Sequence, residues 1–311
     1  MATIACVGAG NVGSAWALVF AKAGHEVKLF DQEKSSLTTR WLPQVADTLA
    51  QLRREQMLDE DPEQVLNRIH IADTLADAVS DAVYVQESVR EDLQIKRQVC
   101  SDIAQFAGDH CLLGSSTSAL PGSQFLGHIH RPQRALIAHP VNPPSLIPLV
   151  ELCASPWTTA EALQQTEELM TALGMKPIIV RKEIDGFILN RLQYTLVAEA
   201  MHLVAEGYCS PEDIDRVMTD GLALRWASIG PFEVAHLNAS EGFEGFVSQL
   251  GPMMKAMGKS AQTDYDWGQQ EVDSIHQAMV KKTPVEDIAQ RQLWRNQQII
   301  RARKMQQAGN R

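Results

Sequence analysis

Residues 1–14 read MATIACVGAGNVGS, and this stretch decides the fold of the N-terminal half. Residues 4–7 form a short apolar run of strand type. Gly8, Gly10 and Gly13 follow this run at the G-x-G-x-x-G spacing, and an apolar segment over residues 15–21 predicts a helix. Strand, glycine loop and helix in this order are typical of the first unit of a doubly wound sheet.

Each position of the loop has a physical task in binding a dinucleotide. Gly8 permits the tight turn, Gly10 lets backbone approach a pyrophosphate, and Gly13 lets the helix lie close to the sheet. Asn11 and Val12 begin the helix, whose free N–H groups face phosphate oxygens. The five residues are therefore predicted to bind the cofactor.

The next strand identifies the dinucleotide. Residues 26–30 read EVKLF and are followed by Asp31, 18 residues after Gly13. A carboxylate there accepts hydrogen bonds from the adenosine ribose and repels a 2′-phosphate, so NAD is predicted rather than NADP. A chance glycine loop in another βαβ unit is the alternative, and the complete unit argues against it.

Composition narrows the classes of protein. The chain has 311 residues, 45% of them hydrophobic and 21% charged, which predicts a globular protein of one large or two ordinary domains. The net charge of −10 disfavours nucleic acid and anionic membranes as partners. The strand at residue 3 or 4 leaves no room for a signal peptide, and no apolar run reaches membrane-spanning length. Five scattered cysteines without a C-x-x-C pair, and no compact cluster of metal ligands, predict a reduced cytoplasmic chain without a metal site.

The first 183 residues alternate between strand and helix patterns. Further strands are predicted at 70–72, 82–86, 111–114, 134–138, 146–152 and 177–181, with helices at 91–106 and 159–173. Residues 33–67 form a polar helical stretch with breaks at Pro43 and Pro62. The alternation predicts a Rossmann-type, doubly wound α/β domain over residues 1–183.

The pattern changes near residue 184, after which no convincing strand is found. Residues 186–207 predict a long helix, and Ser210-Pro211-Glu212-Asp213 predicts a capped helix start. The basic tail over 291–303 is interpreted as a solvated terminal helix or a dimer contact. Residues 184–311 are therefore predicted to form an all-helical domain.

His139 and Glu151 form the central pair of the predicted site. The segment 135–152 is apolar on both sides of a proline-rich turn, so strands that fold back about Ser145 place these two side chains opposite each other. A carboxylate on one imidazole nitrogen fixes the tautomer and stabilises the imidazolium formed when the other nitrogen takes a proton. An alcohol dehydrogenase needs such a base.

Ser118 and Asn190 are suitable neutral hydrogen-bonding groups for the reacting oxygen. Each of the four residues could also have a purely structural role: His139 as a structural histidine, Ser118 and Asn190 as helix caps, and Glu151 as an exposed acid at a sheet edge. The four together, after a cofactor domain, favour a catalytic site.

Long stretches of the chain resemble the 3-hydroxyacyl-CoA dehydrogenase superfamily, and within it the L-gulonate 3-dehydrogenase family that includes lambda-crystallin. The likeness covers nearly the whole chain. Its strongest stretches are SSTS at 115–118, AHPVNPP and IPLVEL within 138–152, KEIDGFILNRLQY at 182–194, and residues 210–238.

The resemblance implies roles for matching residues. It implies that His139 is the general base supported by Glu151, and that Ser118 and Asn190 contact substrate. It places Glu91, Lys96, Ser118 and Asn142 beside the cofactor. It also implies an NAD domain followed by a helical domain through which such proteins are often dimeric.

The substrate is predicted from positions at which this chain differs from the acyl-CoA members of the superfamily. Acyl-CoA members usually carry H-F-F-N-P and M-K-L-V-E where this chain has HPVNPP and IPLVEL, and residues 41–70 contain no lysine for CoA phosphates. Arg225 stands where acyl-CoA enzymes have small residues, and it could clamp a substrate carboxylate or form an ordinary ion pair. L-Gulonate is therefore the predicted substrate. The alternatives are 3-hydroxybutyryl-CoA, carnitine-like hydroxy acids, and a non-catalytic NAD-binding crystallin.

Overall fold

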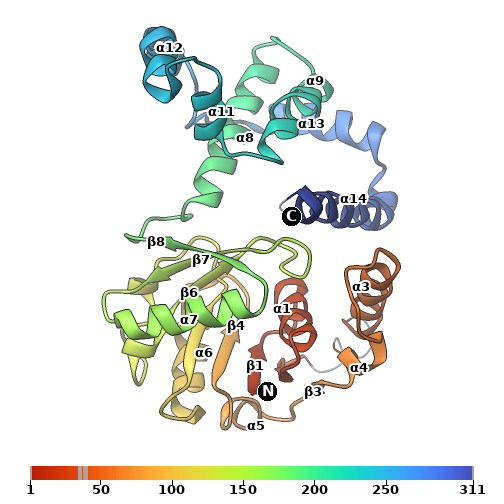
Figure 1. Ribbon diagram of the computed structural model, residues 1–311, viewed down its shortest axis with the longest axis vertical. Helices are drawn as coiled ribbons and strands as arrows, with labels where there is room; N and C mark the ends of the chain where they lie inside the picture. The colour runs from red at the N-terminus through yellow and green to blue at the C-terminus, as the bar shows by residue number, and fades with distance from the viewer. Residues whose placement is uncertain (1, 34–36, 38–40, 310–311) are drawn as a thin grey trace. The chain divides into compact units, whose positions relative to one another are not determined.

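The computed structural model describes residues 2–33, 37 and 41–309. The chain divides into two compact units, Met1–Arg191 and Leu192–Arg311. Figure 1 shows the sheet of the first unit with its helices around it, followed by the helices of the second unit. The predicted α/β class with a helical C-terminal part is confirmed.

The first unit is built on an eight-stranded sheet with the order β3-β2-β1-β4-β5-β6-β7-β8. Its strands are β1 Thr3–Val7, β2 Glu26–Phe30, β3 Ile69–Ile71, β4 Tyr84–Glu87, β5 Leu112–Ser115, β6 Ala135–Pro140, β7 Leu149–Ala154 and β8 Lys176–Val180. All neighbours are parallel except β6 and β7, which run antiparallel. Because the chain order reverses between β1 and β4, the cofactor crevice of such sheets is expected at their carboxyl ends.

The helices that connect the parallel strands include α1 Asn11–Lys22, α5 Leu75–Val79, α6 Leu93–Phe106 and α7 Ala160–Ala172. One buried apolar cluster joins β1, β4 and β5 to α6 through Val7, Val85, Leu113 and Ile103. Removal of this apolar surface from water holds the strand ends in fixed positions.

The polar stretch 33–67 contains α3 Leu42–Arg54 and α4 Pro62–Leu66. Pro43 and Pro62 lie in the first turns of these helices, where a missing N–H costs nothing, so they begin helices rather than interrupt one. Residues 34–36 and 38–40 of the predicted stretch lie outside the described residues.

The antiparallel pairing of β6 with β7 is confirmed, with His139 and Glu151 as direct partners. The strand predicted from residue 146 begins at Leu149 instead. The reason is local, since Leu146 and Ile147 donate their N–H groups to Pro143 O and so belong to the turn.

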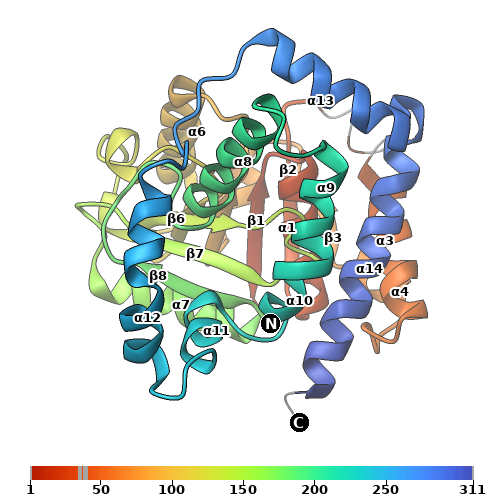
Figure 2. The same ribbon diagram turned by 90° about the horizontal axis from the view of Figure 1, so that it is seen from above.

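The second unit contains no strand among its described residues. Its helices are α8 Leu189–Ala205, which begins in the first unit, α9 Pro211–Arg216, α10 Ala223–Trp226, α11 Pro231–Leu237, α12 Gly242–Gly258, α13 Gln269–Lys282 and α14 Ile288–Gly309 (Figure 2). Ser210 caps α9, as predicted, and also forms a capping box with Asp213. A π-helical segment, Val217–Leu222, joins α9 to α10 and was not predicted. No helix in the described part of the chain has the length and apolarity needed to cross a bilayer.

Candidate active site

His139 and Glu151 meet across the β6–β7 ladder. Glu151 Oε2 lies 2.8 Å from His139 Nδ1, and the two residues are 0% and 4% exposed respectively. The alternative interpretation of Glu151 as an exposed acid at the edge of the sheet is wrong, because Glu151 is buried in β7, between β6 and β8. His139 Nε2 makes no hydrogen bond with any described residue. The pair thus has one ring nitrogen held by a carboxylate and the other available.

Glu151 also binds the start of α8. Its Oε1 accepts the N–H groups of Ile188 at 2.9 Å and Leu189 at 3.0 Å. These N–H groups have no partner within the helix, so the carboxylate satisfies them and benefits from the helix dipole. A single buried side chain therefore fixes both the imidazole and the segment that precedes Asn190.

Phe187 packs its ring against the His139 imidazole, a contact that was not predicted from the sequence. Its fully buried ring lies 5.5 Å from the His139 ring between centroids. Its backbone has φ +49°, a conformation unusual for an aromatic residue, and Gly186 before it has φ +72°. The strained turn directs the aromatic ring against the histidine. The sequence signal for this turn was the Asp-Gly-Phe triplet at residues 185–187.

Ser118 and Asn190 lie together. The Asn190 amide donates from Nδ2 to Ser118 O at 2.8 Å, across 72 residues of sequence. Ser118 is exposed and its hydroxyl has no partner among the described residues. Within the described part of the chain, the Ser118 hydroxyl and the Asn190 side-chain oxygen thus remain available for other hydrogen bonds.

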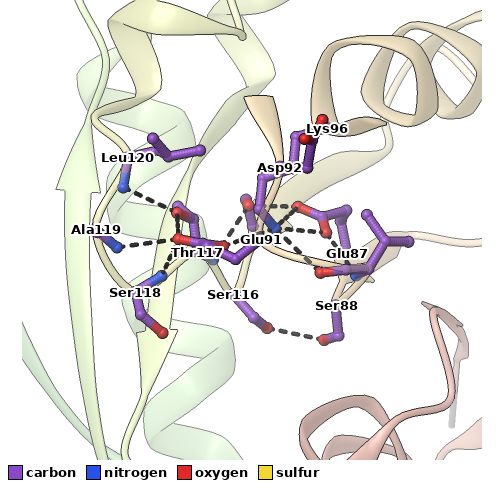
Figure 3. A network of polar contacts seen from close by, with 12 residues as sticks. Glu87, Ser88, Glu91, Asp92, Lys96, Ser116, Thr117, Ser118, Ala119 and Leu120 are labelled. Carbon is purple, nitrogen blue, oxygen red and sulfur yellow. Dashed lines mark hydrogen bonds and ion pairs between the residues drawn. The ribbon is translucent and has the colours of Figure 1, made fainter. Parts of the chain in front are cut away.

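Glu91 holds the backbone of the Ser118 turn (Figure 3). Its Oε1 accepts hydrogen bonds from Thr117 Oγ1 at 2.6 Å, Ser118 N at 2.9 Å and Ala119 N at 3.1 Å. Partial burial raises the pKa of Glu91, but the Thr117 bond, the Lys96 ammonium and the two N–H groups together leave that pKa below its ordinary value. Glu91 is therefore held ionised in the turn.

Lys96 lies behind Glu91 and is only 1% exposed. Its Nζ donates to Glu87 Oε1 at 3.0 Å and lies 3.3 Å from Glu91 Oε2. Burial lowers the pKa of Lys96, but the two carboxylates outweigh it and leave the pKa above its ordinary value. Glu87, which the sequence analysis missed, is fully buried and also accepts from Ser115 Oγ at 2.5 Å. An acid at the end of a buried strand was the signal for it.

The glycine loop fits a dinucleotide. A Cβ on Gly8, which has φ +97°, would lie 2.6 Å from Ser88 backbone, and one on Gly13 would lie 1.8 Å from Gly8 O. A Cβ on Gly10 would meet nothing within 4 Å, so this glycine leaves open space at the start of α1. Asp31 Oδ2 accepts the Ala9 N–H at 2.6 Å, which ties the end of β2 to the loop.

The remaining predicted residues lie apart from these contacts. Asn11 and Asn142 are exposed, Val12 is half-buried, and Asn142 precedes Pro143 through a cis peptide bond. Arg225 lies in α10 of the second unit, where it is exposed and forms no ion pair with a described acid. No group of three or more potential metal ligands was found among the residues that the structure describes.

Comparison with known families gives two matches that follow one another along the chain. The family model described as "3-hydroxyacyl-CoA dehydrogenase, NAD binding domain" matches residues 3–184. The model described as "3-hydroxyacyl-CoA dehydrogenase, C-terminal domain" matches residues 186–275. The glycine loop, His139 and Glu151 all lie within the first match.

Curated relatives match most of the chain. A lambda-crystallin homolog from Bos taurus is 40% identical over 309 residues, which cover 96% of this chain and 94% of the relative. An L-carnitine dehydrogenase from Oceanobacillus iheyensis is 33% identical over 258 residues, with 82% of each chain covered.

A solved structure shares the fold. The structure of 5-formyl-3-hydroxy-2-methylpyridine 4-carboxylic acid 5-dehydrogenase, described as an NAD⁺-dependent dismutase, matches with a TM-score of 0.85. It is 24% identical and the match covers 99% of both chains. The NAD-binding character predicted from the glycine loop is confirmed by the family match.

Proposed function

The chain belongs to the 3-hydroxyacyl-CoA dehydrogenase family, and on that premise we propose that it oxidises the 3-hydroxyl of a small hydroxy acid, L-gulonate to 3-dehydro-L-gulonate, with NAD. The observation that carries the proposal is the buried pair of His139 and Glu151, in which Nε2 of the imidazole has no hydrogen-bond partner among the described residues. That nitrogen is therefore available to take a proton from a bound hydroxy acid.

His139 is the general base of this reaction. Its Nε2 takes the hydroxyl proton of the substrate, and Glu151 beside Nδ1 stabilises the imidazolium that results. When bound, NAD supplies the acceptor for the hydride that leaves the substrate carbon. The N–H groups of Ile188 and Leu189 prevent Glu151 from turning away from the ring.

Ser118 and Asn190 orient the reacting oxygen. The Ser118 hydroxyl has no partner among the described residues, and the bond from Asn190 Nδ2 to Ser118 O holds the Asn190 side chain against the backbone of Ser118. Neutral groups suit this task because the oxygen gains negative character only as its proton leaves. Residues proposed to hold NAD are Gly8, Gly10, Asn11, Val12, Gly13, Asp31, Glu91, Lys96, Ser118 and Asn142.

Arg225 is proposed as the ligand of the substrate carboxylate. Its guanidinium is exposed and is not engaged by a described acid, so the ordinary ion pair considered from the sequence is absent among these residues. Arginine binds a carboxylate through two parallel hydrogen bonds. The relative named as an L-carnitine dehydrogenase supports a carboxylate-bearing hydroxy acid as the substrate class.

A homodimer through the helical domain is part of the proposal. Five apolar side chains of α12 recur at alternating intervals of four and three residues, and each is 38–61% exposed: Phe243, Val247, Leu250, Met254 and Met257. An exposed apolar stripe of this kind is typical of a helix that packs against another chain.

All five cysteines are free, which supports the proposal of a reducing, cytoplasmic location.

The test is NAD reduction with L-gulonate, measured by absorbance beside NADH oxidation with acetoacetyl-CoA. We expect turnover of L-gulonate and a weak reaction with the thioester, both lost in His139→Asn. Efficient turnover of acetoacetyl-CoA alone would instead support the 3-hydroxyacyl-CoA alternative. NADH binding without turnover of either substrate would support a non-catalytic crystallin.

A further inference from the structure

Gln86 is a fully buried amide in β4 that binds the residue after the end of β5 and a residue of β6. Its Nε2 donates to Ser116 Oγ at 2.7 Å and to Ala138 O at 3.3 Å. The paired residues of β5 and β6 end at Ser115 opposite Ile137. Gln86 therefore binds the very next residue on each strand, where the backbone ladder has stopped.

The orientation of the amide follows from its partners. Ala138 O can only accept a hydrogen bond, so the NH₂ group of Gln86 must face it. The amide oxygen then faces Tyr84, whose hydroxyl donates to it at 2.6 Å. Gly114 makes room for this hydroxyl, because a Cβ there would lie 2.0 Å from it. All polar atoms of the side chain are thus used by named partners.

The contact continues to the glycine loop. Ser116 Oγ lies 2.8 Å from Ser88 Oγ, as the dashed line between them marks in Figure 3. Ser88 is packed against the loop, since a Cβ on Gly13 would lie 3.1 Å from Ser88 Cβ. One amide thereby connects the strand that carries the imidazole, the turn that carries Ser118, and the loop at the start of α1.

We propose that Gln86 is a positioning residue that sets the distance between His139 and Ser118. Ala138 directly precedes His139, and Ser116 lies two residues before Ser118, so the amide holds the two segments together at the point where they enter the site. The inference rests on the proposed function, because it concerns the same site.

Gln86→Met tests the proposal, because methionine has a similar length and no hydrogen bonds to offer. We expect kcat to fall about tenfold, since a displacement of about 1 Å in a reacting group can cost as much as a hundredfold. The KM and the NADH affinity, measured by fluorescence, should change less than about threefold, because Gln86 itself forms no hydrogen bond with the residues proposed to hold NAD or substrate. In the cofactor-free protein, hydrogen exchange over residues 115–119 and 137–141 should be faster.

Tyr84→Phe is the matched control, since it removes the bond to the amide oxygen and leaves both donated bonds of Gln86 in place. We expect it to lower the unfolding temperature without lowering kcat. If Gln86→Met does not fold, Ser116→Ala breaks one of the two donated bonds and should lower kcat about threefold.

A kcat within twofold of wild type in the folded Gln86→Met or Ser116→Ala variant, with unchanged exchange in both segments, would overturn the proposal. An equal loss of kcat in Tyr84→Phe would overturn it too, because the effect would then be one of general stability. Absence of wild-type turnover with any hydroxy acid would contradict the proposed function instead, and the exchange measurement would still decide the positioning.

Discussion

Glu151 lies directly opposite His139 in the β6–β7 ladder, and its two carboxylate oxygens perform separate tasks. Oε2 lies 2.8 Å from the imidazole, whereas Oε1 accepts the N–H groups of Ile188 and Leu189. The two tasks can be separated by substitution with glutamine. Its amide oxygen can still accept the N–H groups at the start of α8, whereas its NH₂ group would donate to the imidazole instead of accepting from it.

Glu151→Gln should leave the fold intact and greatly reduce turnover. The amide oxygen can still accept the N–H groups at the start of α8, but the NH₂ group then faces His139 Nδ1 and selects the tautomer with a proton on Nε2. Because that tautomer cannot accept the substrate proton, we expect kcat to fall by about two to four orders of magnitude. Steady-state kinetics would measure this.

The control is Glu183→Gln, because Glu183 also accepts a backbone N–H, from Ser123, and belongs to no proposed site. It should retain wild-type kcat. A Glu151→Gln enzyme with kcat within tenfold of wild type would contradict the proposed role of His139.

Gly10→Ala and Gly13→Ala should separate cofactor binding from stability. A Cβ on Gly10 meets no protein atom within 4 Å, so Gly10→Ala should fold normally and lose NADH affinity at least tenfold. A Cβ on Gly13 would lie 1.8 Å from Gly8 O, so Gly13→Ala should lower the free energy of unfolding by about 1–3 kcal/mol. Thermal unfolding and NADH fluorescence titration measure the two effects, and unchanged NADH affinity in Gly10→Ala would place the pyrophosphate elsewhere.

Asp31→Ser should change cofactor preference. Removal of the carboxylate removes charge-assisted hydrogen bonds to the ribose, so the NADH Kd should rise about tenfold or more. The affinity for NADPH should not fall to the same extent, because the repulsion of the 2′-phosphate disappears as well. Parallel titrations with both cofactors would show this, with Asp102→Ser in α6 as control. An unchanged ratio of the two affinities would argue against Asp31 as the discriminating acid.

Glu91 and Lys96 should make stability depend on pH in opposite directions. The pKa of Glu91 is lowered by folding, so its contribution is complete above the ordinary glutamate pKa of about 4.3 and is lost as pH falls through the folded-state value. The pKa of Lys96 is raised, so its contribution is complete below about pH 10.4 and is lost as pH rises through the folded-state value.

The stability difference between wild type and Glu91→Gln should therefore be constant near neutral pH and shrink below about pH 4. Urea unfolding between acidic and neutral pH would measure it. Glu168→Gln, on the exposed side of α7, should follow the wild-type curve throughout. A difference that stays constant down to acidic pH would show that Glu91 is not held by charge-dependent contacts.

Arg225→Ala should act on substrate affinity alone. Loss of two charge-assisted hydrogen bonds should raise the KM for L-gulonate by about 10–100-fold. The weak reaction with acetoacetyl-CoA, which has no free carboxylate, should not change. Arg216→Ala, in the neighbouring helix α9, is the control and should behave as wild type in both assays. Equal effects on both substrates would remove Arg225 from the proposed site.

Local pattern was sufficient for much of this protein. The sequence of strand, glycines and helix, with Asp31 after the second strand, was readable because each step depends on neighbouring residues. The pairing of His139 with Glu151 was also predictable. Once two strands fold back about a known central residue, here Ser145, that residue determines which positions of the two strands face each other.

Only the tertiary structure decided what those residues contact. The binding of Glu151 to the start of α8, the bond from Asn190 to Ser118, and the burial of Lys96 between Glu87 and Glu91 join segments that lie far apart in the chain or on separate elements. Hydrophobic periodicity carries no information about such polar contacts, which depend on where folded strands end in space. The residues of the candidate site could thus be identified from the sequence alone. Which partners orient them was determined by the packing of the sheet and its helices.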